Sequence, residues 1–197
     1  VGQLVAARLG RPFVDSDVLI EARAGCPIPA IFAERGEAAF RQMEADLCRE
    51  LTGRRGLVIA TGGGTLLNEE NRRLLEASGR VICLTTTPEQ VVARLAGAGG
   101  RPLLSEPDPL AAARRILEQR GPRYASFDWQ VETSDLSPAE VAEAVLRVWR
   151  ARRLSARVAG AEYPILIQED CLSQLGRQFG FLRPGSAVAI VSNPTVW

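Results

Sequence analysis

The stretch VIATGGGTLL, residues 58–67, places three consecutive glycines directly after a short apolar run. Short apolar runs of this kind are typical of strands that a parallel sheet buries on both faces. The glycines allow either a tight turn or the close approach of backbone N–H groups to an oxygen-rich ligand. They do not form a phosphate-binding loop of the type G-x-x-x-x-G-K-[ST], because the chain contains no lysine.

Outward from this stretch, predicted strands and helices alternate, which indicates an α/β fold with a parallel sheet covered by helices on both faces. The segment 97–109 is rich in glycine and proline and is predicted to be a loop. Strands are predicted at 11–17, 56–60, 80–85 and 127–133, and helices at 1–9, 17–24, 28–35, 37–52, 69–78, after Pro88, at 109–119 and at 137–153 with Ser137 as the cap.

The composition changes near residues 155–160, which predicts one domain over 1–154 and the start of another over 157–197. The second piece reads as a β-α-β unit, with strands at 163–167 and 187–192 around a helix at 169–179. About 40 residues is at the lower limit for independent folding. The first helix lacks a capping residue and the only methionine is Met43, while SAVAIVSNPTVW (186–197) reads as a strand, a turn and the start of a new element. We therefore expect both ends to be truncated.

Composition excludes several classes of chemistry. The chain has no histidine, which removes histidine bases, Ser-His-Asp triads and histidine metal ligands. A net charge of +1 gives no reason to expect a nucleic-acid or membrane partner, and no apolar run approaches the ~20 residues that span a bilayer. Without a secretion signal, the four scattered cysteines are expected to be reduced thiols of a cytoplasmic protein.

Two carboxylates, Asp15 and Asp17, follow a predicted parallel strand, where ligands bind in open α/β sheets. One could organise Mg²⁺ while the other accepts a hydrogen bond from a substrate hydroxyl. From the residues alone, the alternative that Asp17 only caps the next helix is preferred.

Arg41 lies one helical turn from both Glu37 and Glu44. This spacing suits either an ordinary surface ion pair or an arginine held so that its planar fork binds a carboxylate. Arg101, in a glycine- and proline-rich loop, suits a lid over a phosphate or an exposed flexible loop. Arg120 is expected to end a helix, where a cation also complements the helix dipole.

Taken together, these blocks resemble shikimate kinase over about residues 1–150. The matching segments are 1–17 (VGQLVAARLGRPFVDSD), 32–47 (FAERGEAAFRQMEADL), 58–67, 101–104 (RPLL), 120–124 (RGPRY) and 131–141 (VETSDLSPAEV). The resemblance implies a P-loop-kinase-like sheet whose first strand and P-loop would lie directly ahead of Val1.

The resemblance also implies roles on the acceptor side of the site. Asp17 would receive the reacting hydroxyl of shikimate and is the candidate base, and Asp15 would act on the Mg²⁺ shell through water. Arg41, oriented by Glu44, and Arg120 would clamp the shikimate carboxylate. The backbone amides of Gly62, Gly63 and Gly64 would face the substrate.

On the donor side, the resemblance implies ATP and Mg²⁺ as cofactors. Arg101 would be a lid arginine that stabilises charge on the γ-phosphate. Arg94 and Pro138 match positions near the adenine. Leu136 stands where some relatives have an adenine-side arginine, so the base-stacking surface at that position departs from the family pattern.

The tail, residues 157–197, resembles the first strands and helix of 3-dehydroquinate synthase. The quoted match is AEYPILIQEDCLSQLG (161–176) and GSAVAIVSNPTVW (185–197). This implies a kinase–synthase fusion in which the tail contacts the rest of the synthase domain. NAD and a divalent metal would belong only to the synthase portion beyond Trp197.

The leading hypothesis is ATP-dependent phosphorylation of shikimate in chorismate biosynthesis, with little activity expected of this chain itself because the P-loop lysine is absent. One alternative is another small-molecule P-loop kinase, such as one for gluconate or nucleotides. Another is a non-catalytic domain that binds shikimate or regulates the synthase.

Overall fold

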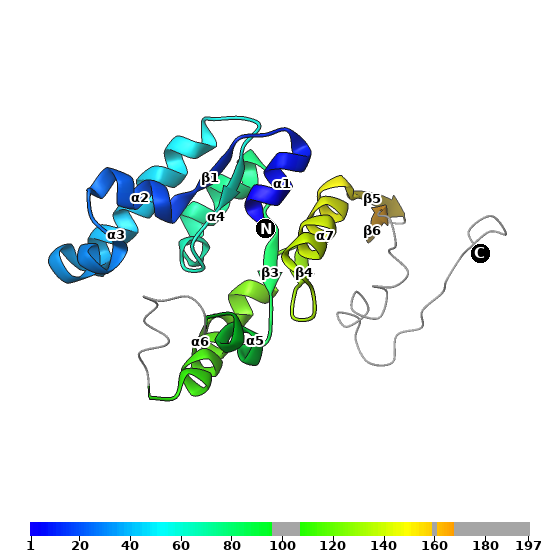
Figure 1. Cartoon of the computed structure of the whole chain (residues 1–197). Helices are drawn as coiled ribbons and strands as arrows, with labels where there is room; N and C mark the ends of the chain where they lie inside the picture. The colour runs from blue at the N-terminus through cyan, green and yellow to red at the C-terminus, as the bar shows by residue number, and fades with distance from the viewer. Residues whose placement is uncertain (96–106, 159–160, 168–197) are drawn as a thin grey trace. The chain divides into compact units, whose positions relative to one another are not determined.

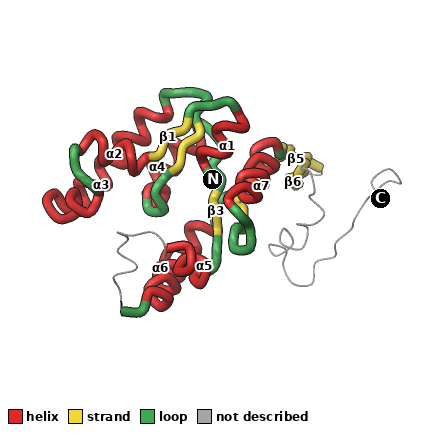
Figure 2. The backbone as a smooth tube through the Cα atoms, viewed as in Figure 1, coloured by secondary structure: helices red, strands yellow, loops and turns green. Residues whose placement is uncertain are grey.

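The computed structural model describes residues 1–95, 107–158 and 161–167 (Figures 1 and 2). The chain divides into two compact units, Val1–Trp149 and Arg150–Trp197, and each is described by itself. The division falls a few residues before the boundary expected from composition. Arg101 and most of the predicted loop at 97–109 lie outside the described residues.

The first unit contains two parallel strand pairs, as the alternation of strands and helices predicts. Strand β1 (Phe13–Asp15) pairs with β2 (Val58–Ala60), with Asp15 opposite Ala60. Strand β3 (Cys83–Thr85) pairs with β4 (Gln130–Glu132). Because paired parallel strands end at the same edge, the segments after β1 and β2 emerge side by side.

Helices separate the strands at nearly all the predicted positions. Two ends differ: α6 continues through Pro122 instead of stopping near residue 119, and α7 stops at Arg150 instead of 153. The helices are α1 (Gly2–Leu9), α2 (Ser16–Ala24), α3 (Ile28–Thr52), η1, a short 3₁₀ helix (Thr65–Leu67), α4 (Glu69–Ser78), α5 (Pro88–Leu95), α6 (Pro109–Ala125) and α7 (Pro138–Arg150).

Local sequence explains several of these boundaries. Gly10 ends α1 in the left-handed conformation, with φ 62°. Gly36 interrupts α3 with φ 78° and ψ 168°, which separates the two helical stretches predicted at 28–35 and 37–52. Ser137 and Glu140 form a capping box at the start of α7: the Glu140 N–H donates to the Ser137 hydroxyl, and the Ser137 N–H donates to the Glu140 carboxylate.

Three apolar clusters hold the first unit together. The largest packs α2 and α3 against β1 and β2, through buried Ile20, Ile31, Phe40, Leu47 and Leu51. A second joins α1 to α7 through Val5, Ala142 and Leu146, and a third joins β4 to α7 through Val131, Val141 and Val148. The clusters anchor the strand ends that carry the carboxylates and glycines singled out from sequence.

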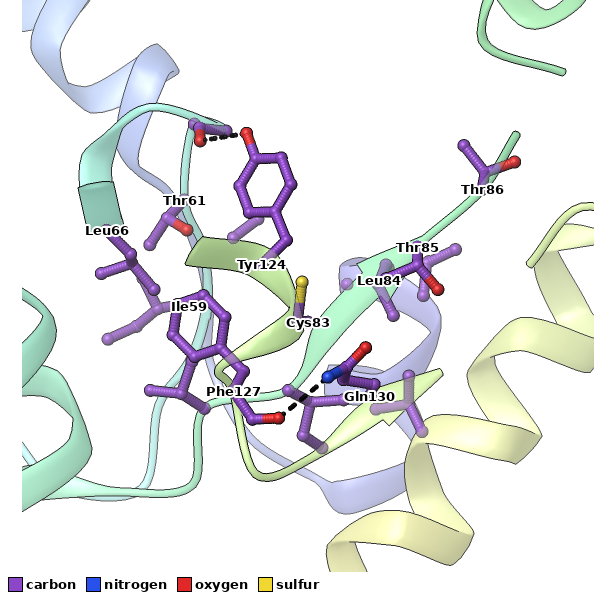
Figure 3. A pocket seen from close by; sticks show the side chains of 18 of the residues that line it. Ile59, Thr61, Leu66, Cys83, Leu84, Thr85, Thr86, Tyr124, Phe127 and Gln130 are labelled. Carbon is purple, nitrogen blue, oxygen red and sulfur yellow. Dashed lines mark hydrogen bonds between the residues drawn. The ribbon is translucent and has the colours of Figure 1, made fainter. Parts of the chain in front are cut away.

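A cavity of about 760 Å³ is lined by β2 and β3 together with parts of α1, α6 and α7. We call it the apolar slot. Figure 3 shows Ile59 of β2, Cys83 and Leu84 of β3, and Tyr124 of α6 around it. Within the described residues, β2 pairs only with β1 and β3 only with β4.

The apolar slot corrects the expectation that the strands at 56–60 and 80–85 are buried on both faces. The three residues of β2 are half-buried, and Leu84 of β3 is 45 % exposed. Val1 and Leu117, two other exposed apolar side chains, also line the slot. The apolar side chains of both strands are therefore only partly buried by the rest of the structure.

The described part of the second unit is an antiparallel hairpin of β5 (Arg152–Val158) and β6 (Ala161–Ile167). β6 confirms the strand predicted at 163–167. β5 was missed, although Leu154, Ala156 and Val158 alternate with polar residues at the period of a strand. The predicted helix at 169–179 and strand at 187–192 lie outside the described residues. No helix of the described residues is long and apolar enough to cross a membrane.

Candidate active site

The glycine loop, Gly62–Gly64, lies directly against the carboxylate that follows β1. The Gly62 N–H donates to the Ser16 hydroxyl at 3.3 Å. A Cβ placed on Gly62 would lie 3.0 Å from Asp17 Oδ1 and 3.5 Å from Oδ2. The two segments meet because Asp15 and Ala60 are paired in parallel strands. Glycine at position 62 therefore leaves the Asp17 carboxylate room beside the loop.

The two aspartates have different surroundings. Asp15 Oδ1 accepts hydrogen bonds from the N–H groups of Asp17 and Val18, at 3.0 and 3.3 Å, so Asp15 is the N-cap of α2. The alternative in which Asp17 is the cap is wrong. Burial raises the pKa of the half-buried Asp17 carboxyl, and the nearby carboxylates of Asp15 and Glu44 raise it further.

Arg41 is held on both sides by carboxylates of α3. Its Nη1 donates to Glu44 Oε2 at 2.7 Å, while Nε and Nη2 donate to Glu37 Oε1 at 3.1 and 2.9 Å. Glu44 is only 2 % exposed, so this pair is not the ordinary surface contact that the spacing also allowed. Three of the five N–H donors of the guanidinium are used, which leaves two for another acceptor.

Gly64 places the glycine loop against this arginine as well. A Cβ on Gly64 would lie 2.8 Å from Arg41 Nη1, closer than real Cβ contacts. The loop therefore touches Asp17 at one end and Arg41 at the other. A base candidate and a carboxylate-binding candidate lie on either side of one short backbone segment.

Helix α6 reaches the middle of the same loop. The Tyr124 hydroxyl donates to the Gly63 carbonyl at 2.8 Å, the contact drawn as a dashed line in Figure 3. Arg120 lies one turn earlier on α6, half-buried, and makes no hydrogen bond or ion pair with the described residues. The expectation that Arg120 ends its helix is wrong, since α6 continues to Ala125.

The residues assigned to the adenine side lie at the ends of α5 and α7. Arg94, in the last turn of α5, donates to the Thr133 hydroxyl at 3.0 Å and to the backbone carbonyls of Thr133 and Ser134. Pro138 is the exposed first residue of α7. Leu136 packs against the third apolar cluster. Arg94 thus ties α5 to the segment after β4.

Comparison with known proteins adds to this geometry. The sequence model described as "SKI: Shikimate kinase" matches residues 1–150. The chain belongs to the shikimate kinase family. A shikimate kinase of Synechococcus sp. (strain JA-3-3Ab) is 44 % identical over 153 residues, which cover 77 % of this chain and 79 % of the relative. A shikimate kinase of Cupriavidus pinatubonensis is 44 % identical over 147 residues, covering 74 % of this chain and 77 % of the relative.

Solved structures of the shikimate kinase family confirm the fold class. Shikimate kinase from Acinetobacter baumannii in complex with shikimate superposes with a TM-score of 0.70 at 37 % identity, covering 75 % of this chain and 83 % of that one. The enzyme from Aquifex aeolicus gives 0.65 at 31 % identity, covering 75 % and 86 %. The prediction of a P-loop-kinase-like α/β fold and a phosphotransferase is confirmed.

Family membership implies ATP and Mg²⁺ in general, and the described residues fit these groups only in part. Asp15 Oδ2 makes no hydrogen bond within the described residues and could accept one from a water of the Mg²⁺ shell. No cluster of three metal-ligating side chains occurs among them. The sequence also offers no lysine to the phosphates of a nucleotide. The described residues therefore fit the binding site of the phosphate acceptor better than that of the nucleotide.

Sequence reasoning missed three side chains that support the loop: Thr65, Asn71 and Tyr124. The Thr65 hydroxyl donates to Glu44 Oε1 at 2.5 Å, and Asn71 Nδ2 donates to the Thr65 carbonyl at 3.1 Å. Tyr124 was quoted only as part of the RGPRY block. A Thr directly after the glycines and a Tyr one turn after Arg120 were the available signals, and neither residue type is distinctive by itself.

Proposed function

We propose that this protein phosphorylates the 3-hydroxyl of shikimate with ATP to give 3-phosphoshikimate, in the chorismate route to aromatic amino acids. The observation that carries the proposal is the placement of Asp17 and Arg41 against the two ends of one glycine loop. A hydroxyl and a carboxylate of one small molecule can contact both residues at once. Positioning of this kind, together with stabilisation of charge, is most of what a protein contributes to phosphoryl transfer.

In this proposal each acceptor-side residue has a separate task. Asp17 accepts the hydrogen bond of the reacting hydroxyl and takes up its proton; its raised pKa brings the carboxyl closer to neutral pH than an ordinary aspartate. The two unused donors of Arg41 bind the carboxylate of shikimate as a planar fork. Arg120, which has no partner among the described residues, contributes the second positive charge.

The phosphate-binding part of the donor side rests on segments outside the described residues. ATP supplies the phosphoryl group when bound, and Mg²⁺ neutralises its charge. Arg101 is proposed as the lid arginine over the γ-phosphate, and Arg94 and Pro138 as neighbours of the adenine. For Arg94 this means that the face of the guanidinium meets the base, since its N–H groups already bond to Thr133 and Ser134.

We also propose that a strand and a P-loop precede Val1 in the complete protein. The apolar slot supports the strand, because β2 and β3 each present an edge without a partner among the described residues, and exposed apolar side chains line the space between. Val1 and Gly2 line the same slot, so a strand lying in it would lead directly into α1. Without the P-loop lysine, the 197-residue chain by itself would have negligible kinase activity.

The tail is proposed to begin a 3-dehydroquinate synthase domain fused to the kinase, with NAD and a divalent metal bound only by the rest of that domain. Its support is the sequence match over 157–197. The alternatives to the kinase proposal are less well supported. An uncharged sugar acceptor needs no pair of arginines at its binding site. A domain that only binds shikimate needs no carboxylate placed to take up a proton from the substrate hydroxyl.

The test measures shikimate binding to the 197-residue protein and to two variants by isothermal titration calorimetry. Arg41→Ala and Arg120→Ala should each weaken shikimate binding by about tenfold or more, because each removes a charge-assisted bond to the carboxylate. Arg35→Ala, an arginine of the same helix as Arg41, is the matched control and should bind normally. Equal weakening in all three variants, or no shikimate binding by the parent protein, would refute the acceptor assignment.

A further inference from the structure

A chain of buried polar side chains lies behind Arg41. Glu44, Thr65 and Asn71 are 2, 1 and 2 % exposed. The Asn71 amide donates to the Thr65 carbonyl, the Thr65 hydroxyl donates to Glu44 Oε1, and Glu44 Oε2 accepts from Arg41 Nη1. We call Asn71, Thr65 and Glu44 the buried relay. It connects α4, η1 and α3, and it ends on the guanidinium proposed to bind substrate.

The relay fixes both oxygens of Glu44. Thr65 Oγ1 lies 2.5 Å from Oε1, and Arg41 Nη1 lies 2.7 Å from Oε2. Without the threonine hydroxyl, a buried carboxylate oxygen would lose its short hydrogen bond and the carboxylate could rotate about its last torsion angle. Such a rotation would move the acceptor for Arg41 Nη1, and the remaining donors of the arginine would turn with it.

Thr65 is itself held by α4. Asn68 caps α4 by accepting hydrogen bonds from the N–H groups of Glu70 and Asn71, and this sets the place of Asn71. The Asn71 side-chain amide then donates to the Thr65 carbonyl, and the Thr65 N–H donates to the Gly62 carbonyl at the start of the glycine loop. The loop and the carboxylate partner of Arg41 are therefore positioned by the same residue.

Packing alone does not account for the relay. Burying polar groups is costly unless each finds a partner, and Asn71 Oδ1 is buried without a hydrogen-bond partner among the described residues. Apolar residues of similar volume would fill this space without that cost. A tight, oriented connection to Arg41 is what these three polar side chains provide and apolar ones would not.

We propose that Thr65 and Asn71 are positioning residues for recognition of the substrate carboxylate, acting on Arg41 through Glu44. This rests on the proposed shikimate-binding function and adds residues to it. The relay holds the guanidinium against Gly64 with two donors not used by Glu37 or Glu44, so that a planar carboxylate meets a preorganised fork. Neither Thr65 nor Asn71 touches the substrate.

The experiment compares two ligands, shikimate and its methyl ester, which lacks the negative carboxylate. Dissociation constants are measured by calorimetry for the 197-residue protein, Thr65→Val, Thr65→Ser and Asn71→Leu, with melting temperatures recorded in parallel. Thr65→Val and Asn71→Leu should each weaken shikimate binding by about tenfold and ester binding by less than about twofold. Thr65→Ser keeps the hydroxyl and should retain the preference for the acid.

The outcomes separate the two proposals. No preference for shikimate over the ester in the parent protein would refute the carboxylate clamp, and the positioning role with it. A parent protein that prefers the acid while Thr65→Val and Asn71→Leu keep the full preference would overturn the positioning role alone. A variant that loses both ligands equally has only a structural defect, which also counts against the proposal. If Thr65→Val does not fold, Thr65→Ala removes the same hydroxyl without adding a methyl group beside the carboxylate.

Discussion

At the scale of single residues, the glycine loop is explained by what each glycine faces. Gly62 faces the Asp17 carboxylate and Gly64 faces the Arg41 guanidinium, whereas the nearest atom to a Cβ on Gly63 is the Tyr124 hydroxyl at an ordinary 3.6 Å. The loop is thus glycine-rich because the Asp17 and Arg41 side chains, both proposed to bind substrate, lie against it. A general need for a tight turn would not distinguish the three positions.

This difference gives a prediction for the loop. Gly64→Ala should displace Arg41 Nη1 from its place 2.8 Å from the new Cβ and weaken shikimate binding by about tenfold, since the carboxylate fork would be misplaced. Gly79→Ala, at the end of α4 with open space around the new Cβ, is the control and should bind shikimate normally. Calorimetric titration of both variants measures the difference. If Gly64→Ala binds shikimate as tightly as the parent protein, Arg41 does not need to lie against the loop.

Asp17 gives a prediction about stability and pH. Its pKa in the folded protein is raised by burial and by the carboxylates of Asp15 and Glu44. The folded protein therefore binds the Asp17 proton more tightly than the unfolded chain does. The resulting stability is fully present below the pKa of the unfolded chain and is lost as pH rises through the folded pKa. At neutral pH the ionised Asp17 is consequently a cost to folding.

We expect Asp17→Asn to melt at a higher temperature than the parent protein at pH 7, with the gain shrinking as pH falls through the acidic range. Shikimate binding should be weakened at the same time, because a neutral amide oxygen accepts a weaker hydrogen bond from the hydroxyl than a carboxylate does. Asp135→Asn, at an exposed position, controls for the loss of one negative charge. Thermal melts by circular dichroism from pH 3 to 8 measure this, and a neutral-pH melt below that of the parent would contradict it.

The sequence was informative about these residues where partners are close along the chain. Arg41 and Glu44 are one helical turn apart, and Asp15 and Asp17 follow one strand. Thr65 and Glu44 are 21 residues apart, and their contact exists only because η1 packs against α3. A threonine after a glycine run has many ordinary explanations, so the buried relay could be found only in three dimensions.

At the scale of elements, α3 shows a break that the sequence predicted from one glycine. Gly36 has φ 78° and ψ 168°, a region that only glycine enters readily. Gly36→Ala should lower the free energy of unfolding by about 1–3 kcal/mol, although no atom lies within 4 Å of the new Cβ. Urea denaturation measures this change.

Gly121 provides the control for this prediction. It lies inside α6, also with open space around a new Cβ, and its φ is not in the left-handed range. Gly121→Ala should change the free energy of unfolding by less than about 1 kcal/mol, because the helix preference of alanine is offset by the contact of its Cβ with the ring of Pro122. Equal destabilisation by both substitutions would show that the break in α3 is not what makes Gly36 necessary.

Helix α6 shows where sequence reasoning about an element fails. Gly121 and Pro122 predict a helix end, and proline inside a helix costs about 3 kcal/mol. The last turn of α6 persists because its side chains are tied to other elements. Tyr124 bonds to Gly63, and Arg123 pairs with Glu69 at the start of α4. Tertiary contacts made far away in the chain outweigh the local signal.

At the scale of the whole first unit, composition and structure disagree about two strands, and the apolar slot accounts for the disagreement. The runs at 56–60 and 80–85 are apolar enough for burial on both faces, yet β2 is half-buried and Leu84 is 45 % exposed. Helix–strand alternation predicted the parallel pairs correctly. It could not show that the two pairs stand apart, because strand order depends on contacts between distant segments.

The last prediction follows from this slot. A longer polypeptide carrying the proposed upstream strand and P-loop should place that strand between β2 and β3 and bury Val1, Leu84 and Leu117. Covering these side chains should raise the melting temperature by about 5 °C or more, and the added lysine should restore ATP-dependent turnover of shikimate. Hydrogen exchange should slow at the amides of β2 and β3 but not at those of β1. The longer polypeptide could regain activity while the amides of β2 and β3 exchange as fast as before. The slot would then still be open, and the added strand would have to lie elsewhere.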